Sequence, residues 1–293
     1  MFNKLHRDPR KVDGRTTTCP QIQKVIAEVK RYENVPDRCE PLDLTMIRHF
    51  ISHNEFCCQT SLAAALIDWW IVGIHGGFRQ SEWCQAQGKA TIGNEKVTEQ
   101  KKKDRPLAFT PDDVEFLTRK RKKFLTDAAL EHPQLVWYVR LRFHWQKNKD
   151  NGEKKLFVTN TKQPRLCPVQ AWMRIFKRYK SISKTTKVPT LAVYHDRVAG
   201  NAKNITAPDV TEALRKTAKA VYDLNDKELS AFSCHSIRVG ACCILFSQGV
   251  RPAQIKKLLR WRSDAWTVYL RDLTTIANNQ VEAITAAVEL PCL

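Results

Sequence analysis

Two arginines in separate segments, each with a polar neighbour three residues away, have the types and spacing expected of a phosphate-binding site. Arg79 follows an apolar segment and a pair of glycines, and Glu82 comes three residues later. A carboxylate at that spacing can orient the guanidinium group through charge-assisted hydrogen bonds. In the second segment, the i,i+3 spacing of His235 and Arg238 puts both side chains on one face of a helix. Arginine is a permanent cation whose planar fork fits phosphate oxygens, and histidine exchanges protons near neutral pH.

Two further segments supply a candidate nucleophile and a candidate acid. Tyr269 follows Trp261 by eight residues. A tyrosine can act as a covalent nucleophile, and a tryptophan can donate one indole hydrogen bond from an apolar body. Lys147 and Lys149 lie in the turn of a predicted hairpin, where neighbouring cations can lower the pKa of a lysine enough for general-acid catalysis. Taken singly, each segment has a simpler explanation as a core aromatic, a helix-terminal arginine or a solvated lysine.

The composition indicates a globular protein with a polyanionic partner. The chain has 293 residues, of which 43% are hydrophobic and 27% charged, and this excludes a wholly disordered chain, collagen and a disulfide-rich miniprotein. Lys and Arg number 49 against 30 Asp and Glu, which leaves a formal charge of +19. Nucleic acid is the expected partner, because an anionic membrane would need an anchor or an amphipathic basic helix.

Nothing in the sequence predicts secretion, a membrane span or a metal site. The first ten residues are polar and charged, and the longest apolar stretch, 61–77, is short and contains Asp68, so we expect a buried core helix there. The ten cysteines include no C-x-x-C spacing and are expected to be reduced thiols. We therefore expect no cofactor, and a nuclear location in a eukaryote or a cytoplasmic one otherwise.

The elements that must position these residues are mainly helices. Hydrophobic periodicity predicts helices at 21–32, 44–52, 60–75, 168–179, 208–222, 235–248, 252–260, 265–272 and 279–290. Residues 136–145 alternate as a strand, with one face formed by Val136, Tyr138, Arg140 and Arg142 and the other by Val139, Leu141, Phe143 and Trp145. A turn at 150–152 and a strand at 155–159 complete a hairpin, and a weaker strand is expected at 108–116. The predicted fold class is α+β, mostly helical with a small antiparallel sheet.

Basic residues also occur in two runs. Lys101, Lys102, Lys103 and Arg105 belong to a polar segment, 85–106, that is predicted to be a loop. A second run covers 119–123. Either run could face DNA or act as a nuclear import signal, although such runs are more often solvated surface.

In combination, the candidate residues resemble the tyrosine recombinase (phage integrase) family, which has arginine, hairpin lysine, His-x-x-Arg, tryptophan or histidine, and tyrosine in this order. The resemblance covers about Leu42 to Asp272. Gly-Phe-Arg-Gln-Ser-Glu matches the family's Gly-Leu-Arg-x-x-Glu box, and His-Ser-Ile-Arg-Val-Gly matches its His-x-x-Arg box. Leu166-Cys-Pro-Val is similar to the family's segment after the hairpin, and the Trp-x-Ser-Asp-Ala box is similar to recombinases of eukaryotic mobile elements, such as Crypton-like elements.

The resemblance implies metal-independent cleavage and rejoining of double-stranded DNA. Tyr269 would attack the scissile phosphate and form a 3′-phosphotyrosyl link, while Arg79 and Arg238 hold the non-bridging oxygens. The remaining implied roles are proton transfer at the nucleophile by His235, a hydrogen bond or a packing contact from Trp261, orientation of Arg79 by Glu82, and protonation of the leaving 5′ oxygen by Lys147, with Lys149 as the alternative.

The resemblance also implies a domain organisation and an assembly. Residues 1–41 are expected to be a basic arm or linker, 42–275 the catalytic domain, and 276–293 a C-terminal helix that packs either in cis or on a neighbouring subunit of a DNA-bound homotetramer. Family members carry a separate N-terminal DNA-binding domain, for which about forty residues are too few. Arg260 stands where the family usually has glycine, and Arg262 adds a further candidate DNA contact.

Three other functions are compatible with the same sequence. A mobile-element remnant could bind DNA without cleaving it, and a type IB topoisomerase would relax DNA by similar chemistry but with histidine at the position of Trp261. A basic RNA-binding protein would not require the four segments in this order. Integration, excision and inversion share one active site, so the sequence does not distinguish them.

Overall fold

The computed structural model describes residues 38–54, 58–84, 91–92, 95–96, 107–144, 146, 151–185 and 189–270. The chain divides into two units, Met1–Arg38 and Cys39–Leu293, and all described residues except Arg38 belong to the second. The predicted helices at 21–32 and 279–290 lie outside the described residues.

Five helices build the core of the second unit: α2 (Leu44–His53), α3 (Leu62–Gly76), α7 (Pro168–Ser183), α8 (Ala207–Tyr222) and α10 (Ser236–Ser247). The central helix is α3, which contacts α2, α7 and α10. Its sequence is apolar on every side because it is buried on every side, and Trp69 and Trp70 have no exposed surface. The predicted core helix is therefore confirmed. The single acidic residue of α3, Asp68, forms ion pairs with Arg174 and Arg178 of α7, at 2.6 and 2.5 Å.

The main sheet has four antiparallel strands in the order β4 (Lys123–Phe124), β3 (Val114–Leu117), β5 (Tyr138–Arg142) and β6 (Lys154–Val158). The predicted hairpin is confirmed as β5–β6, with Arg142 opposite Lys154. Val139 and Leu141 are buried, as their positions in the alternating pattern predict. The alternating pattern places Val136 on the other face, but Val136 is also buried, because it precedes the strand and packs into the core.

Short elements make up the remainder of the described structure. The hairpins are β1 (Thr91–Ile92) with β2 (Glu95–Lys96), and β7 (Val193–Asp196) with β8 (Asn201–Asn204). The short helices are α4 (Gln80–Trp83), α6 (Thr126–Glu131), α9 (Asp226–Ser230) and α11 (Pro252–Leu258), and the 3₁₀ turns are η3 (Pro111–Asp113), η4 (Pro133–Leu135), η5 (Pro164–Leu166) and η6 (Asp264–Tyr269). The loop prediction for 85–106 was wrong at β1 and β2, and the predicted 108–116 strand is replaced by η3 followed by β3.

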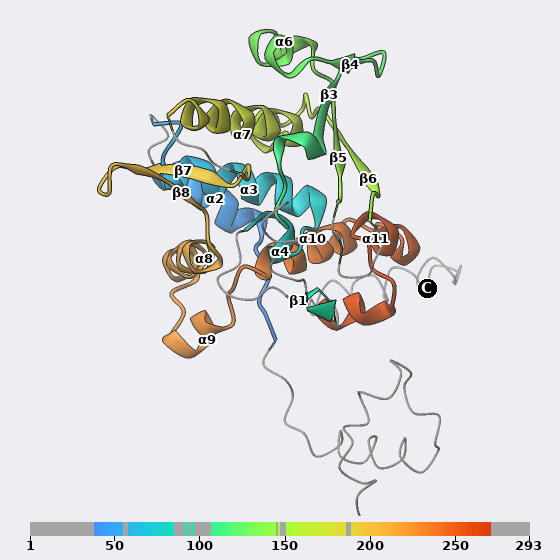
Figure 1. The fold of residues 1–293 in the computed structure, drawn as a ribbon. Helices are drawn as coiled ribbons and strands as arrows, with labels where there is room; N and C mark the ends of the chain where they lie inside the picture. Colours follow the sequence, from blue (N-terminus) through green and yellow to red (C-terminus); the bar gives the residue numbers. More distant parts are fainter. Residues whose placement is uncertain are drawn as a thin grey trace, which may run out of the picture. The chain divides into compact units, whose positions relative to one another are not determined.

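The elements that matter for the site meet at one end of the sheet. Figure 1 shows β5 and β6 extending towards α10 and α11, with α4 close by. Gly77 ends α3 in the left-handed conformation, with φ of 59°, and the chain then turns directly into α4. The fold class is α+β, mostly helical with a small antiparallel sheet, as predicted. None of the described helices combines the length and the apolar character that a membrane crossing requires.

Candidate active site

The C-terminal turn of α11 is the structural centre of the site. Arg260 adopts a left-handed conformation with φ of 58°. Its N–H donates to the carbonyl of Lys257 at 3.3 Å, and the N–H of Trp261 donates to the carbonyl of Lys256 at 2.8 Å. This is the Schellman pattern that commonly closes a helix, here with arginine at the position usually held by glycine. The predicted helix 252–260 therefore ends two residues early, at Leu258.

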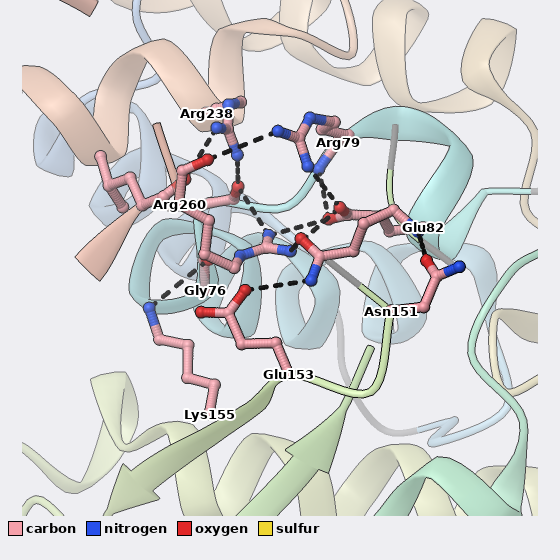
Figure 2. Close-up of polar contacts among 11 residues, drawn as sticks. Gly76, Arg79, Glu82, Asn151, Glu153, Lys155, Arg238 and Arg260 are labelled. Atoms are coloured by element: carbon pink, nitrogen blue, oxygen red, sulfur yellow. Dashed lines mark hydrogen bonds and ion pairs between the residues drawn. The ribbon is translucent and has the colours of Figure 1, made fainter. Parts of the chain in front are cut away.

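Three cationic side chains bind the three consecutive carbonyl groups that this turn exposes. Carbonyls at a helix C-terminus lack intrahelical partners and carry partial negative charge, so they attract cations. The donor–acceptor pairs are Lys155 Nζ to Leu258 O at 2.7 Å, Arg238 Nη2 to Leu259 O at 2.7 Å, and Arg79 Nη2 to Arg260 O at 3.5 Å (Figure 2). Side chains from α10, β6 and the start of α4 are thus gathered around one backbone turn.

Arg79 is oriented by Glu82, as its spacing predicts. Arg79 is the N-cap residue of α4, and its backbone N–H donates to Glu82 Oε2 at 2.8 Å while its Nη1 donates to Oε1 at 3.0 Å. Burial alone would raise the pKa of Glu82, but the guanidinium groups of Arg260 and then Arg79 outweigh this and hold the pKa below its ordinary value. Glu82 is therefore an ionised carboxylate shared by two arginines.

Arg238 is held even more tightly. It is 2% exposed, and its Nη1 donates to the carbonyl of Gly77, which the left-handed end of α3 turns towards the site. The guanidinium also lies over the Trp261 ring, with Cζ 4.3 Å from the centroid. Burial, followed by the charges of Arg79 and Arg260, lowers the pKa of Arg238 to about 9. The group stays cationic at neutral pH, in a place where like charges favour binding of an anion.

His235 and Tyr269 form a hydrogen-bonded pair beside these arginines. His235 Nε2 lies 3.1 Å from the Tyr269 hydroxyl, and the Trp261 ring centroid lies 5.6 Å from that of Tyr269. Burial and then the charge of Arg238 lower the pKa of His235 below 6.5. A neutral imidazole at this distance can accept the phenol proton, which is the geometry expected of a nucleophile and its base. Tyr269 is the last residue of η6, so the structure has a 3₁₀ turn where a helix over 265–272 is predicted. Residues 271–272 of that predicted helix lie outside the described part of the chain.

The structure brings together six of the predicted site residues: Arg79, Glu82, His235, Arg238, Trp261 and Tyr269. Arg262 is exposed and lies just beyond Trp261. Five predicted residues lie outside the described part of the chain, as does the alternative lysine: Lys101, Lys102, Lys103, Arg105, Lys147 and, as that alternative, Lys149. Gln146, directly before them, is described and 2% exposed. In the described part of the chain, no three His, Cys, Asp or Glu side chains are grouped to hold a metal ion.

The site contains two further cations that the sequence does not predict as site residues. Arg260 was noted only as a departure from the expected glycine, yet it is 6% exposed and pairs with Glu82. The sequence predicts Lys155 only as the first residue of a strand, but its Nζ also lies 3.5 Å from the carbonyl of Gly76. No sequence signal singles out Lys155, because its partners come from distant segments.

Lys155 gives the stability of the fold a pH dependence. Burial, and then the charges of Arg260 and Arg238, lower its pKa from 10.5 to about 7. Between those pH values the unfolded chain binds a proton that the folded chain has released, so the free energy of unfolding rises with pH over this interval. We expect Lys155→Met to lose most of this rise between about pH 7 and about pH 9, below the range in which Arg238 also releases its proton, as measured by urea unfolding at several pH values. The neighbouring, exposed Lys154→Met is the control, and an unchanged pH slope in Lys155→Met would contradict the assignment.

Comparison with known proteins gives likenesses only at the level of solved structures. No protein-family model and no curated protein matches the chain. The chain is similar to the integrase of transposon Tn1549 in complex with transposon right end DNA, at 16% identity and a TM-score of 0.45, over 90% of this chain and 70% of that one. For the same integrase with circular intermediate DNA, the identity is 16% and the TM-score 0.40, over 86% and 69% of the two chains. Similarity at this level assigns neither a family nor an activity to the chain.

Proposed function

We propose that the chain cleaves and rejoins DNA strands through a covalent 3′-phosphotyrosyl intermediate, as tyrosine recombinases do. The observation that carries this proposal is the hydrogen bond between His235 and Tyr269 beside two oriented arginines. A tyrosine with a neutral base on its hydroxyl and guanidinium groups next to it is equipped to attack a phosphodiester. A protein that merely binds DNA has no need for this pairing.

The first chemical step transfers a phosphoryl group to Tyr269. As its oxygen attacks phosphorus, the proton passes to His235 Nε2 and the bond from phosphorus to the 5′ oxygen breaks. Arg79 and Arg238 stabilise the negative charge that builds on the non-bridging oxygens. The indole N–H of Trp261 is buried and has no partner among the described residues, so Trp261 is assigned a packing contact against Tyr269 and Arg238. Rejoining reverses the step, with a 5′ hydroxyl as the nucleophile.

Protonation of the leaving 5′ oxygen is assigned to Lys147, with Lys149 as the alternative. Support comes from Gln146, whose Oε1 accepts from Arg260 Nη1 at 3.1 Å and whose Nε2 donates to Glu153 Oε2 at 3.0 Å. The hairpin therefore enters its turn at the site itself. The formal charge of +19 fits a chain that holds the DNA backbone through many phosphate contacts and loses affinity steeply with salt.

The proposal is tested by trapping the covalent intermediate. The protein is incubated with a pool of nicked, random-sequence duplexes, from which the short leaving strand diffuses away after cleavage. EDTA is present because two fixed cations, rather than a divalent metal, are assigned to the phosphate. The expected result is a DNA adduct on a denaturing gel, located on Tyr269 by peptide mass spectrometry. DNA binding without any adduct would favour a non-cleaving remnant, and relaxation of plasmid without recombinant products would favour a topoisomerase.

The pH dependence of cleavage is expected to follow His235. Because burial and the charge of Arg238 hold the pKa of His235 below its ordinary value, the imidazole is neutral at pH 7 and His235 does not limit the rate above that pH. The rate should fall at lower pH as His235 gains a proton and can no longer accept one from Tyr269. His235→Gln should lower the rate by about 10²-fold and remove this acidic limb. Single-turnover adduct formation is measured from about pH 5 to about pH 8, the range in which histidine titrates; an acidic limb that persists in His235→Gln would exclude His235 as its source.

A further inference from the structure

Arg260 is a buried cation in a costly backbone conformation. A left-handed conformation costs a residue with a side chain about 1 kcal/mol or more, and burial of a charge costs several times that unless the charge is paired. Its guanidinium carbon lies 3.6 Å from the centroid of the Phe143 ring. Such a residue persists when the surrounding contacts require it, so its partners indicate what it does.

The main partner of Arg260 is the carboxylate that orients Arg79. Arg260 Nη1 and Nη2 donate to the two oxygens of Glu82 at 3.0 and 2.9 Å, which is a bidentate pair (Figure 2). Arg79 shares the same carboxylate through one Nη and its backbone N–H. Without Arg260, the negative charge of Glu82 would fall on Arg79 alone.

The two arginines differ in what else they can reach. The Arg260 side chain is 2% exposed and Glu82 is 3% exposed, whereas 22% of the Arg79 side chain is exposed. Both Nη atoms of Arg260 are committed to Glu82, to Gln146 and to the carbonyl of Gly77 at 3.4 Å. Arg260 therefore contacts the Glu82 carboxylate from the buried side, and Arg79 contacts it from the solvent-accessible side.

We propose that Arg260 is a positioning residue that neutralises Glu82 and so leaves the charge of Arg79 available to the scissile phosphate. The inference rests on the proposed function. Glu82 then orients Arg79 without cancelling its charge. With Glu82 neutralised by Arg260, the charges of Arg79 and Arg238 both remain available, and they match the two negative charges of a pentavalent phosphorane. A glycine at position 260 would remove the cost of the left-handed backbone conformation. Glu82 would then pair with Arg79 alone and neutralise its charge.

The first test is a double-mutant cycle between Arg260 and Glu82, measured as single-turnover adduct formation. We expect Arg260→Met to lower the rate by about 10²-fold, comparable to the loss of one transition-state donor. In a Glu82→Gln background no carboxylate remains to be neutralised, so the same substitution should cost less than about threefold. Arg260→Lys retains the charge and should recover most of the rate. Arg251→Met, an exposed cation at the other end of α11, is the matched control and should leave the rate unchanged.

The second test separates charge balance from simple loss of structure. The scissile phosphate is replaced by a methylphosphonate, which has one non-bridging oxygen fewer and no charge, so it depends less on Arg79. The defect of Arg260→Met relative to wild type should shrink at least about tenfold on this substrate. An equal defect on both substrates, or an undiminished defect in the Glu82→Gln background, would overturn the inference. If the wild-type protein forms no adduct at all, the proposed function itself fails, and the two failures are thereby distinguished.

Discussion

A Tyr269→Phe protein is expected to form no covalent adduct and to cleave no DNA, while it binds DNA as tightly as the wild type. The substitution removes only the hydroxyl group that lies 3.1 Å from His235 Nε2. The ring contacts with His235 and Trp261, at centroid distances of 5.5 and 5.6 Å, remain possible for phenylalanine. No other group on the aromatic ring can act as a nucleophile, so the loss should reach the detection limit of the gel assay.

The matched control is Tyr222→Phe. Tyr222 is an exposed tyrosine at the end of α8 whose hydroxyl donates to Asp43, away from the site residues described above. Its substitution should leave adduct formation unchanged. If Tyr269→Phe formed as much adduct as the wild type, another side chain would be the nucleophile. Peptide mapping of that adduct would identify it.

The second large effect is expected for Arg238→Met, which should lower the cleavage rate by about 10³-fold and also destabilise the fold. The guanidinium group is assigned to the phosphate, and loss of one such donor typically costs about 10²- to 10³-fold in rate. It also satisfies two backbone carbonyls, those of Gly77 and Leu259. The Gly77 carbonyl keeps a longer hydrogen bond from Arg260 Nη2 at 3.4 Å, whereas the Leu259 carbonyl loses its hydrogen bond from Arg238, and a buried unpaired carbonyl costs about 1–3 kcal/mol. The thermal unfolding temperature should therefore fall together with the rate.

Arg238→Lys distinguishes the two roles of the arginine. A single ammonium group retains the charge but cannot donate to both carbonyls and also lie over the Trp261 ring, as the guanidinium group does. We expect part of the rate to return with little recovery of stability, measured by single-turnover cleavage and by thermal unfolding. Wild-type cleavage by Arg238→Met would remove Arg238 from the proposed mechanism, whatever the change in stability.

The larger elements of the fold could be predicted because short-range physics determines them. The alternation of side chains in residues 136–145 and the Asp150-Asn151-Gly152 turn predict the β5–β6 hairpin. A continuous apolar run predicts α3. The shorter elements, such as α6, α9 and the β7–β8 hairpin, were missed. Segments of four to six residues are too short to show a hydrophobic periodicity. They form because tertiary contacts stabilise them.

The contacts within the site also divide into local contacts, which the sequence predicts, and long-range contacts, which it does not. Arg79 and Glu82 are three residues apart, so a single turn of backbone makes them neighbours whatever the remainder of the chain does. The proximity of His235 to Tyr269 spans 34 residues. The sequence suggests that contact only through its resemblance to a known family, because no local spacing produces it.

The residue types of the site, the order in which they occur and the helix that follows His235 and carries Arg238 can be read from the sequence alone. The partners of Arg260 and Lys155, in contrast, depend on how distant segments pack together. Arg260 meets Glu82 across 178 residues, and Lys155 meets the carbonyl of Leu258 across 103. The physical reason is that a buried charge is tolerated only where an opposite charge or a carbonyl is brought to it, and packing of distant segments supplies that partner. The left-handed turn after α11, which aims three carbonyls at three cations, is such a place.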